Sequence, residues 1–279
     1  MPFTFNSFLQ GYGIQPGEVR LLRHQSGPHS GRTPYTLWRD TPDQFVAYQS
    51  VQTAQNQSRL NAPFWASFVV TPSQQTLFVG LYEVERLGKC DHEMIDPLRL
   101  VSVTQDGSRD LDLYSQRQVD ACADYAGRMF VDWGPGTRTW IQLAVNQPKP
   151  ITEISRAFRE DEFPGYGRFI SKLSAIEALP GTWLSALRAA KGIYLLTCPN
   201  TKEQYVGSAT GDGGFLARWL AYVHDGHGGN VGLKSRDSSD YQVSILEVSG
   251  SAVAEKDILD AEQLWKAKLQ SREMGLNRN

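Results

Sequence analysis

The stretch Gly192-Ile193-Tyr194, followed by Tyr205-Val206-Gly207, decides the fold of the last third of this chain. The segment 191–198 is rich in aliphatic and aromatic residues, which predicts a strand. Turn-forming residues follow it, and 204–207 predicts a second strand, so we expect a hairpin. Because side chains alternate between the faces of a strand, the two tyrosines can present neighbouring hydroxyls. Tyrosine is also an ordinary strand residue, and that interpretation stays open from the hairpin alone.

A helix is expected after the hairpin, over 215–223. Apolar residues recur there at helical spacing and form one stripe, which predicts a buried face. Arg218 and Tyr222 are four residues apart, so they lie on one flank of that stripe. A guanidinium matches phosphate oxygens bidentately, and this arrangement therefore suits phosphate binding. An ordinary surface arginine is the alternative.

Glu262 interrupts the apolar stripe of a second expected helix, over 251–270. Ile258, Trp265 and Leu269 occupy the core-facing positions, and Glu262 falls between them. Burying an unpaired carboxylate costs several kcal/mol, so this group should be neutralised, paired or bound to a cation. A hard divalent ion is one solution. A buried ion pair, for instance with Arg218, is the other.

The order of these residues resembles the GIY-YIG nuclease family over 191–279, ending with Asn277 in Gly275-Leu276-Asn277. The resemblance implies a small mixed sheet flanked by helices. It also implies hydrolysis of phosphodiester bonds with one divalent ion, Mg²⁺ or Mn²⁺, in each active site. In the second triplet, Val206 is a mild departure from the family pattern. Ser208 stands where several DNA-repair relatives carry a lysine.

The resemblance also implies roles for individual residues. Tyr194 would act as, or relay to, the general base, with activity rising towards alkaline pH. Glu262 would hold the metal, and Arg218 would stabilise the charge of the transition state. The remaining implied site residues orient water and phosphate or tie the C-terminal tail to the site; they are Tyr205, Tyr222 and Asn277. His224 and His227 either contribute a proton-transfer group or belong to a solvated loop.

Composition limits the remaining possibilities. The chain has 279 residues, enough for two domains, and 41% hydrophobic residues, which indicates a folded protein. We expect no membrane span and no signal region, and three widely spaced cysteines favour a reducing cytoplasm. The formal net charge is −2. Any DNA-binding surface must therefore be a local patch, which favours a selective enzyme over charge-driven degradation of DNA.

Residues 1–150 predict a separate, strand-rich α/β domain with a barrel-like sheet. We expect strands at 36–38, 64–71, 76–84, 98–103, 128–133 and 139–143. The pattern around 76–84 is loosely similar to PUA-like barrels, including EVE and ASCH domains, which read modified or unusual bases. We expect 151–190 to form a structured helical connector, with helices over 169–179 and 183–190, so the overall class is α/β (α+β).

Aromatic and basic residues near turns are candidates for DNA binding. Aromatic rings can stack on a base, and an extruded base needs such a pocket with polar groups for its edge. Most of these aromatics can equally belong to the core. The candidates in residues 1–150 are Arg23, His24, Tyr35, Trp38, Trp133, Arg138 and Trp140, and those near the expected active site are Lys234 and Arg236.

These features favour a metal-dependent DNA endonuclease whose N-terminal domain selects the target. Restriction or phage defence is the expected role, with cutting that depends on base modification as the preferred version. Its partner would be DNA, and double-strand cleavage would require a dimer or two successive cuts. A nucleic-acid-binding reader with a silent nuclease fold is the alternative from another class. A DNA-repair incision nuclease is a further one.

Overall fold

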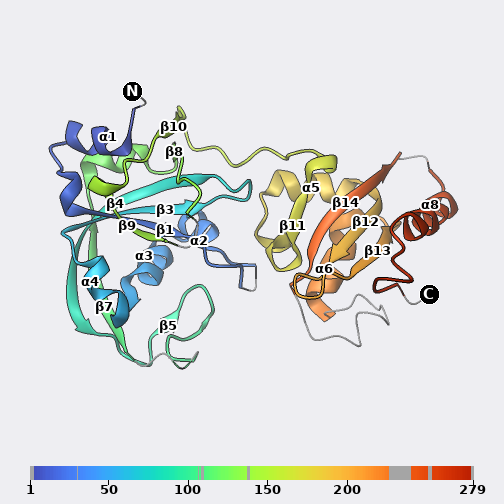
Figure 1. Cartoon of the computed structure of the whole chain (residues 1–279), viewed down its shortest axis with the longest axis horizontal. Coiled ribbons are helices and arrows are strands. Elements are labelled where there is room, and N and C mark those ends of the chain that lie inside the picture. Colours follow the sequence, from blue (N-terminus) through green and yellow to red (C-terminus); the bar gives the residue numbers. More distant parts are fainter. Residues whose placement is uncertain are drawn as a thin grey trace. The chain divides into compact units, whose positions relative to one another are not determined.

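A computed structural model describes residues 3–29, 31–105, 107, 110–136, 139–225, 240–250 and 253–277. The chain is of mixed α/β class and divides into two compact units, Met1–Asp161 and Glu162–Asn279 (Figure 1). The boundary falls inside the expected connector. Strand β10 (Ile151–Ile154) pairs within the first unit, whereas helix α5 (Gly181–Ala189) packs within the second.

The first unit is built on a curled mixed sheet with strand order β10-β8-β4-β3-β1-β9, to which β7 and β2 are added through β4. The helices are α1 (Phe5–Gly11), α2 (Pro34–Asp40), α3 (Pro42–Ser50) and α4 (Gln57–Leu60). The strands before β10 are β1 (Val19–His24), β2 (Val51–Thr53), β3 (Phe64–Val70), β4 (Thr76–Lys89), β5 (Ile95–Asp96), β6 (Val101–Ser102), β7 (Leu111–Gln118), β8 (Met129–Val131) and β9 (Ile141–Leu143).

Strand β4 causes the curl because its two halves pair with different neighbours. Its first half pairs with β3, and its second half continues beyond β3 to pair with β7. The register between β3 and β4 shifts next to Gly80, whose φ of 155° is a conformation that favours glycine. Helix α1 packs on one face of the sheet through Phe5 and Phe8, and α2 and α3 cover the other through Leu37 and Phe45.

Two of the expected strands in this unit are wrong or too long. The segment 36–38 lies inside helix α2, because Thr33 caps the helix and Pro34 occupies its first turn. Of 98–103, only Val101–Ser102 is extended, and it pairs with the short strand β5. Strands β3, β4, β8 and β9 lie where the sequence predicts them.

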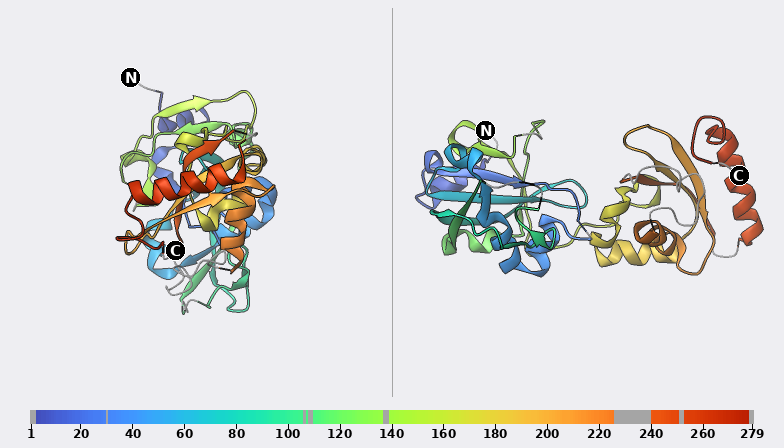
Figure 2. Two further views of the ribbon diagram at one scale, coloured as in Figure 1. Left: turned by 90° about the vertical axis from the view of Figure 1, so that its right-hand side faces the viewer. Right: turned by 90° about the horizontal axis from the view of Figure 1, so that it is seen from below.

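The second unit contains an antiparallel sheet with strand order β11-β14-β12-β13. Its strands are β11 (Ile170–Lys172), β12 (Lys191–Thr197), β13 (Gln204–Ala209) and β14 (Gln242–Ser249). Helices α5 and α6 (Gly214–Asp225) cover one face, and α8 (Glu255–Lys268) covers the other (Figure 2). The sheet is therefore sandwiched between helices within this unit.

The expected helix over 169–179 is wrong. Residues 170–172 form β11, because they pair with β14 at the edge of the sheet, and a 3₁₀ helix follows over Leu173–Ala178. Leu173 and Ile176 are both buried, which matches the three-residue turn of a 3₁₀ helix. Among the described residues, no helix combines the length and the apolar character that crossing a membrane requires.

Candidate active site

The β12–β13 hairpin places two tyrosines on one face of the sheet. Tyr194 is opposite Gly207, and Leu196 is opposite Tyr205, so both rings point towards helices α5 and α6. Gly207 allows the two rings to approach. A Cβ atom at this position would lie 2.6 Å from Cζ of Tyr194 and 2.8 Å from Cε1 of Tyr205. The glycine of the second triplet is thus required by the position of Tyr194.

Helix α6 adds an arginine and a third tyrosine to the same face. The hydroxyl oxygens of Tyr194 and Tyr222 are 2.8 Å apart, and Nε of Arg218 donates to the Tyr194 hydroxyl at 3.2 Å. The Arg218 guanidinium lies over the Tyr222 ring, 5.1 Å from its centroid. Tyr205 completes the group, with its ring 6.4 Å from that of Tyr222. We call these four residues the tyrosine–arginine cluster.

Burial sets the protonation state of this cluster. Tyr194 is fully buried and Tyr222 is 2% exposed. Burial raises the pKa of both phenols well above the ordinary value, and the neighbouring Tyr205 raises the pKa of each further. Arg218 acts in the opposite direction, but the net shift is upwards. Both hydroxyls are therefore neutral near pH 7. This disfavours Tyr194 as a general base and suits it to orienting Arg218.

Glu262 lies on helix α8, where the sequence places it, within the apolar stripe. The residue is 8% exposed. The Ser208 hydroxyl donates to its Oε2 atom, and Nζ of Lys266 lies 2.7 Å from Oε1. The ion-pair partner is therefore Lys266, itself only 1% exposed, one helical turn further along. Sequence reasoning missed this lysine, although its spacing of four residues from Glu262 was a readable signal.

The tyrosine–arginine cluster and Glu262 lie on opposite faces of the sheet. Strand alternation turns Tyr194 towards α6, whereas Ile193 and Val206 pack with Ile258 of α8. The edge strand β13 connects the two groups. Its Gly207 accommodates the Tyr194 ring, and the next residue, Ser208, contacts Glu262.

The oxygen donors near Glu262 are compatible with a hard divalent cation. A carboxylate and a hydroxyl are both ligands that Mg²⁺ accepts, with water completing its shell. Each carboxylate oxygen offers two lone pairs, so the bonds with Ser208 and Lys266 leave acceptor sites on Glu262. No group of three or more His, Cys, Asp or Glu side chains gathers within the described ranges. A cation bound to Glu262 would compete with the ammonium group of Lys266.

Asn277 fixes the C-terminal tail to the hairpin. Its Oδ1 accepts from the backbone amide of Val206 at 2.9 Å, and its Nδ2 donates to the backbone carbonyl of the same residue at 2.8 Å. Gly275 also lies close to the hairpin, because a Cβ atom there would collide with the Gln204 carbonyl oxygen. The two hydrogen bonds of Asn277 thus join the tail to strand β13. His224 is exposed near the end of α6, and His227 lies outside the described residues.

The candidate DNA-binding residues separate into different groups. Tyr35 and Trp133 are core residues, with 2% and 4% exposure, so neither ring has a face available for stacking on a base. This burial disfavours base stacking by either ring, because Trp133 belongs to the core on one face of the sheet and Tyr35 to the core on the other. Trp38 is half-buried and packs edge-on against Phe158. The candidates Arg23, His24 and Trp140 line one cavity, whereas Arg138, Lys234 and Arg236 lie outside the described residues.

Comparison with known proteins gives a limited result. No protein-family model matches the chain, and no curated protein matches it. Among solved structures, the chain is similar to a mutant of the catalytic domain of the intron endonuclease I-TevI. The identity is 24%, the match covers 32% of this chain and 94% of that chain, and the TM-score is 0.28.

Proposed function

We propose that this chain is a DNA endonuclease of the GIY-YIG type, which hydrolyses phosphodiester bonds with a divalent metal ion. The observation that carries the proposal is the convergence of Tyr194, Arg218 and Tyr222 on one face of the sheet. A hydroxyl fixes the guanidinium at Nε, and an aromatic ring supports its plane. An arginine whose planar guanidinium is held in this way is pre-organised to donate two parallel hydrogen bonds to two oxygens of an anion such as phosphate.

Arg218 is proposed to bind the scissile phosphate and to stabilise the extra negative charge of the transition state. Because the tyrosines hold it, little reorganisation accompanies the reaction, which is the condition for electrostatic stabilisation. Tyr194 and Tyr222 act as neutral positioning groups, which their burial supports. Tyr205 is 5% exposed and lies beside Tyr222, where it would help to orient the phosphate.

Glu262 is proposed to hold the metal, Mg²⁺ or Mn²⁺, with one ion in each active site. An ion bound there would supply Lewis-acid polarisation of the phosphate and would lower the pKa of its bound water. Ser208 orients the carboxylate through its hydroxyl, and Lys266 balances the charge of Glu262 when no metal is bound. The scissile phosphate would then lie at the edge strand β13, between Arg218 and Glu262.

The N-terminal unit is proposed to choose the DNA target. Near-balanced charge, with 28 basic and 30 acidic residues, is consistent with selective rather than charge-driven binding. Restriction or phage defence, with cutting that depends on base modification, is the biological role that this arrangement favours. The proposed site would cut one strand at a time, so cutting both strands would require a dimer or two successive events.

A nucleic-acid-binding reader without cleavage activity is the second candidate function. Two observations favour it: Lys266 already neutralises Glu262, and the hydroxyls of Tyr194 and Tyr222 are buried. Under this alternative, the chain would bind DNA equally well with and without a divalent ion and would not cut it.

Cleavage of supercoiled plasmid in the presence of Mg²⁺ separates the two candidates. We expect wild-type protein to nick or linearise plasmid DNA, and Arg218→Ala to reduce the rate by about 10²–10³, the usual loss for one transition-state donor. Arg188→Ala is the matched control, because Arg188 is exposed on α5 of the same unit. Binding without cutting by wild-type protein, across plasmids with and without modified cytosine, would establish the reader instead.

A further inference from the structure

The first unit contains a cavity that the proposed cleavage chemistry does not use. Its volume is about 470 Å³, within the usual range for ligand sites. Strand β1, helix α3, strand β2 and the segment after β5 all contribute to its walls. Its lining is predominantly polar, which is unusual for space left by imperfect packing.

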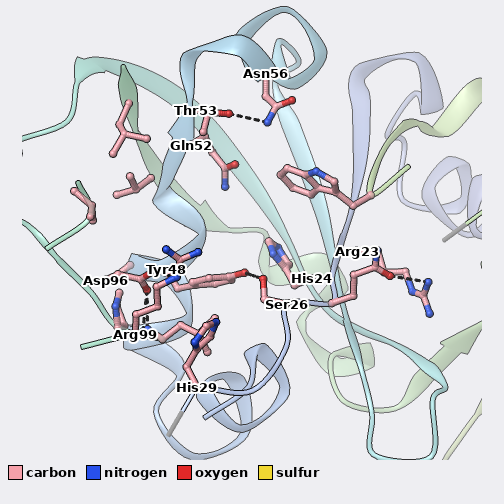
Figure 3. Close-up of a pocket in the computed structure, with 18 residues that line it drawn as sticks. Arg23, His24, Ser26, His29, Tyr48, Gln52, Thr53, Asn56, Asp96 and Arg99 are labelled. Atoms are coloured by element: carbon pink, nitrogen blue, oxygen red, sulfur yellow. Dashed lines mark hydrogen bonds and ion pairs between the residues drawn. The ribbon is translucent and has the colours of Figure 1, made fainter. Parts of the chain in front are cut away.

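Exposure changes systematically from the floor of this cavity to its rim. His24 and Gln52 are buried at the floor, Tyr48 and Trp140 are half-buried, and Arg99 is exposed. In Figure 3, the side chains of Gln52, Tyr48 and His24 point towards the same space. The rings of Tyr48 and Trp140 lie 5.5 Å and 6.2 Å from the His24 ring, so three flat side chains border the cavity.

Hydrogen bonds from inside the core hold the polar floor in place. Oε1 of Gln49 lies 3.1 Å from His24 Nε2 and accepts from the Ser67 hydroxyl at 2.7 Å. An amide oxygen only accepts, so His24 donates from Nε2, and its Nδ1 is an acceptor. Nε2 of Gln52 donates to the Gln49 backbone carbonyl at 2.9 Å, which fixes the Gln52 amide plane. The floor thus presents directional hydrogen-bonding groups whose orientation is set in advance.

His24 remains neutral in this setting. Its burial lowers the pKa to about 4, and the hydrogen bond with Gln49 opposes this shift only in part. A neutral imidazole beside an amide recognises a neutral hydrogen-bonding ligand rather than an anion. Two arginines also line the cavity: Arg23 is buried and donates to Gln25 at 3.0 Å, and Arg99, at the rim, lies 3.6 Å from Asp96. The cavity therefore suits a ligand with a flat, neutral polar edge and a charged group further out.

We propose that this cavity binds a single nucleobase, with Tyr48 and Trp140 against its faces and Gln52 and His24 at its hydrogen-bonding edge. Arg99 at the rim would face the attached phosphate. A base extruded from DNA and the base of a free nucleotide share this chemistry. The assignment of the ligand to a base extruded from DNA rests on the proposed function, because a nuclease that selects its target by one extruded base needs such a site.

Binding measured without divalent metal tests the inference independently of cleavage. We would measure the anisotropy of a labelled duplex with a central mismatch, a fully paired duplex and a duplex lacking the central base. A mismatched base costs less to extrude, so the mismatch should bind more tightly than the other two duplexes. Calorimetric titration with free nucleosides, including 5-methyl- and 5-hydroxymethyl-deoxycytidine, tests whether the cavity binds the base of a free nucleotide.

Two substitutions identify the cavity as the site. Trp140→Ala should weaken binding of the mismatched duplex by about fivefold to a hundredfold, the range for losing one base–aromatic stack. Trp140→Phe keeps a ring and should lose less. Gln52→Leu should remove discrimination between bases, whereas Gln57→Leu, the same change at an exposed position of the same unit, should not. Trp140 is only half-buried, so its truncation leaves the fold available for the test.

The outcomes are distinct. A mismatch preference that Trp140→Ala and Gln52→Leu abolish supports an extruded base. Saturable nucleoside binding without a mismatch preference, lost in the same variants, supports a free nucleotide as the source. Equal binding of all three duplexes with no nucleoside binding would overturn the proposal, as would preferences that neither substitution changes. Loss of plasmid cutting alone would refute the proposed nuclease and leave this inference standing.

Discussion

Replacing Gly207 with alanine should displace Tyr194, whose hydroxyl contacts both Tyr222 and Arg218 in the tyrosine–arginine cluster. The new Cβ atom would lie 2.6 Å from Cζ of Tyr194, whereas ordinary contacts begin at 3.4 Å. The phenol side chain would therefore have to move by at least about 0.8 Å, the difference between these two distances, because its hydroxyl oxygen lies closer still to the new Cβ atom. Tyr194 is fully buried, and it packs against Phe215 and Trp219, so the ring cannot simply swing into solvent.

The expected cost has two components. Forcing extra volume into a packed core costs about 1–3 kcal/mol. Moving the Tyr194 hydroxyl also weakens its bonds with Tyr222 and Arg218, and each such bond contributes about 0.5–1.5 kcal/mol. We therefore expect the Gly207→Ala variant to lose about 2–6 kcal/mol of unfolding free energy. Gly207 does not have a left-handed φ, so the cost is steric.

Equilibrium unfolding in urea measures this loss, and Gly211→Ala is its matched control. Gly211 lies in the loop after the hairpin, and a Cβ atom there would meet nothing within 4 Å. The double substitution Gly207→Ala/Tyr194→Phe removes the hydroxyl closest to the new methyl group and should recover part of the stability. Equal stability of Gly207→Ala and Gly211→Ala would refute the close approach of Gly207 and Tyr194.

Three further predictions concern other parts of the two units. Asn277→Leu should destabilise the second unit by about 1–3 kcal/mol, because it leaves the backbone amide and carbonyl of Val206 unsatisfied; an unchanged urea midpoint would contradict this. The pKa of His24 in the folded protein is about 4, below its ordinary value of 6.5. Neutral His24 therefore stabilises the folded state fully above pH 6.5, and this stabilisation is lost as the pH falls towards 4. The melting temperature of wild type should therefore fall more steeply between pH 6.5 and 4 than that of His24→Gln, and parallel pH profiles of the two proteins would contradict this prediction. Burial raises the pKa of Tyr194, so no phenolate forms there between pH 6 and 9; a cleavage rate that rises across this range in wild type but not in Tyr194→Phe would restore the general-base role.

Much of the second unit was predictable because its signals are local. The strands around the two triplets, the helix with Arg218 and the helix with Glu262 all follow from hydrophobic spacing, and the structure has them. Strand β14 and the extended segment 170–172 were not predicted. Their pairing joins residues about seventy positions apart, and such contacts leave little trace in local sequence.

The first unit shows where local propensity is overridden. Residues 36–38 contain aromatic and β-branched side chains, but the cap at Thr33 and the proline after it begin a helix there. In the sequence, Trp133 and Trp140 flank the same run of turn residues, so their positions do not tell the two apart. Only the packing of the sheet shows that the first is core and that the second borders a cavity.

The candidate site was predictable in its components and not in its arrangement. Alternation within strands and the four-residue spacing on α6 correctly bring Tyr194, Arg218 and Tyr222 together. The sequence also predicts burial of Glu262, with a metal or an ion pair, for instance with Arg218, to compensate its charge; the structure provides Lys266 instead. The sequence does not reveal how the sheet separates the two groups, because that depends on which face each helix covers.

Cleavage of a DNA panel with Mg²⁺ by wild-type protein and Glu262→Gln tests the central claim most directly. The panel contains unmodified, methylated and hydroxymethylated plasmid, and Glu177→Gln is the control, since Glu177 is exposed in the same unit. The account predicts metal-dependent cutting of at least one substrate by wild type and by Glu177→Gln, and its loss in Glu262→Gln. Cutting by Glu262→Gln at the wild-type rate, or no cutting of any substrate by wild-type protein, would contradict it.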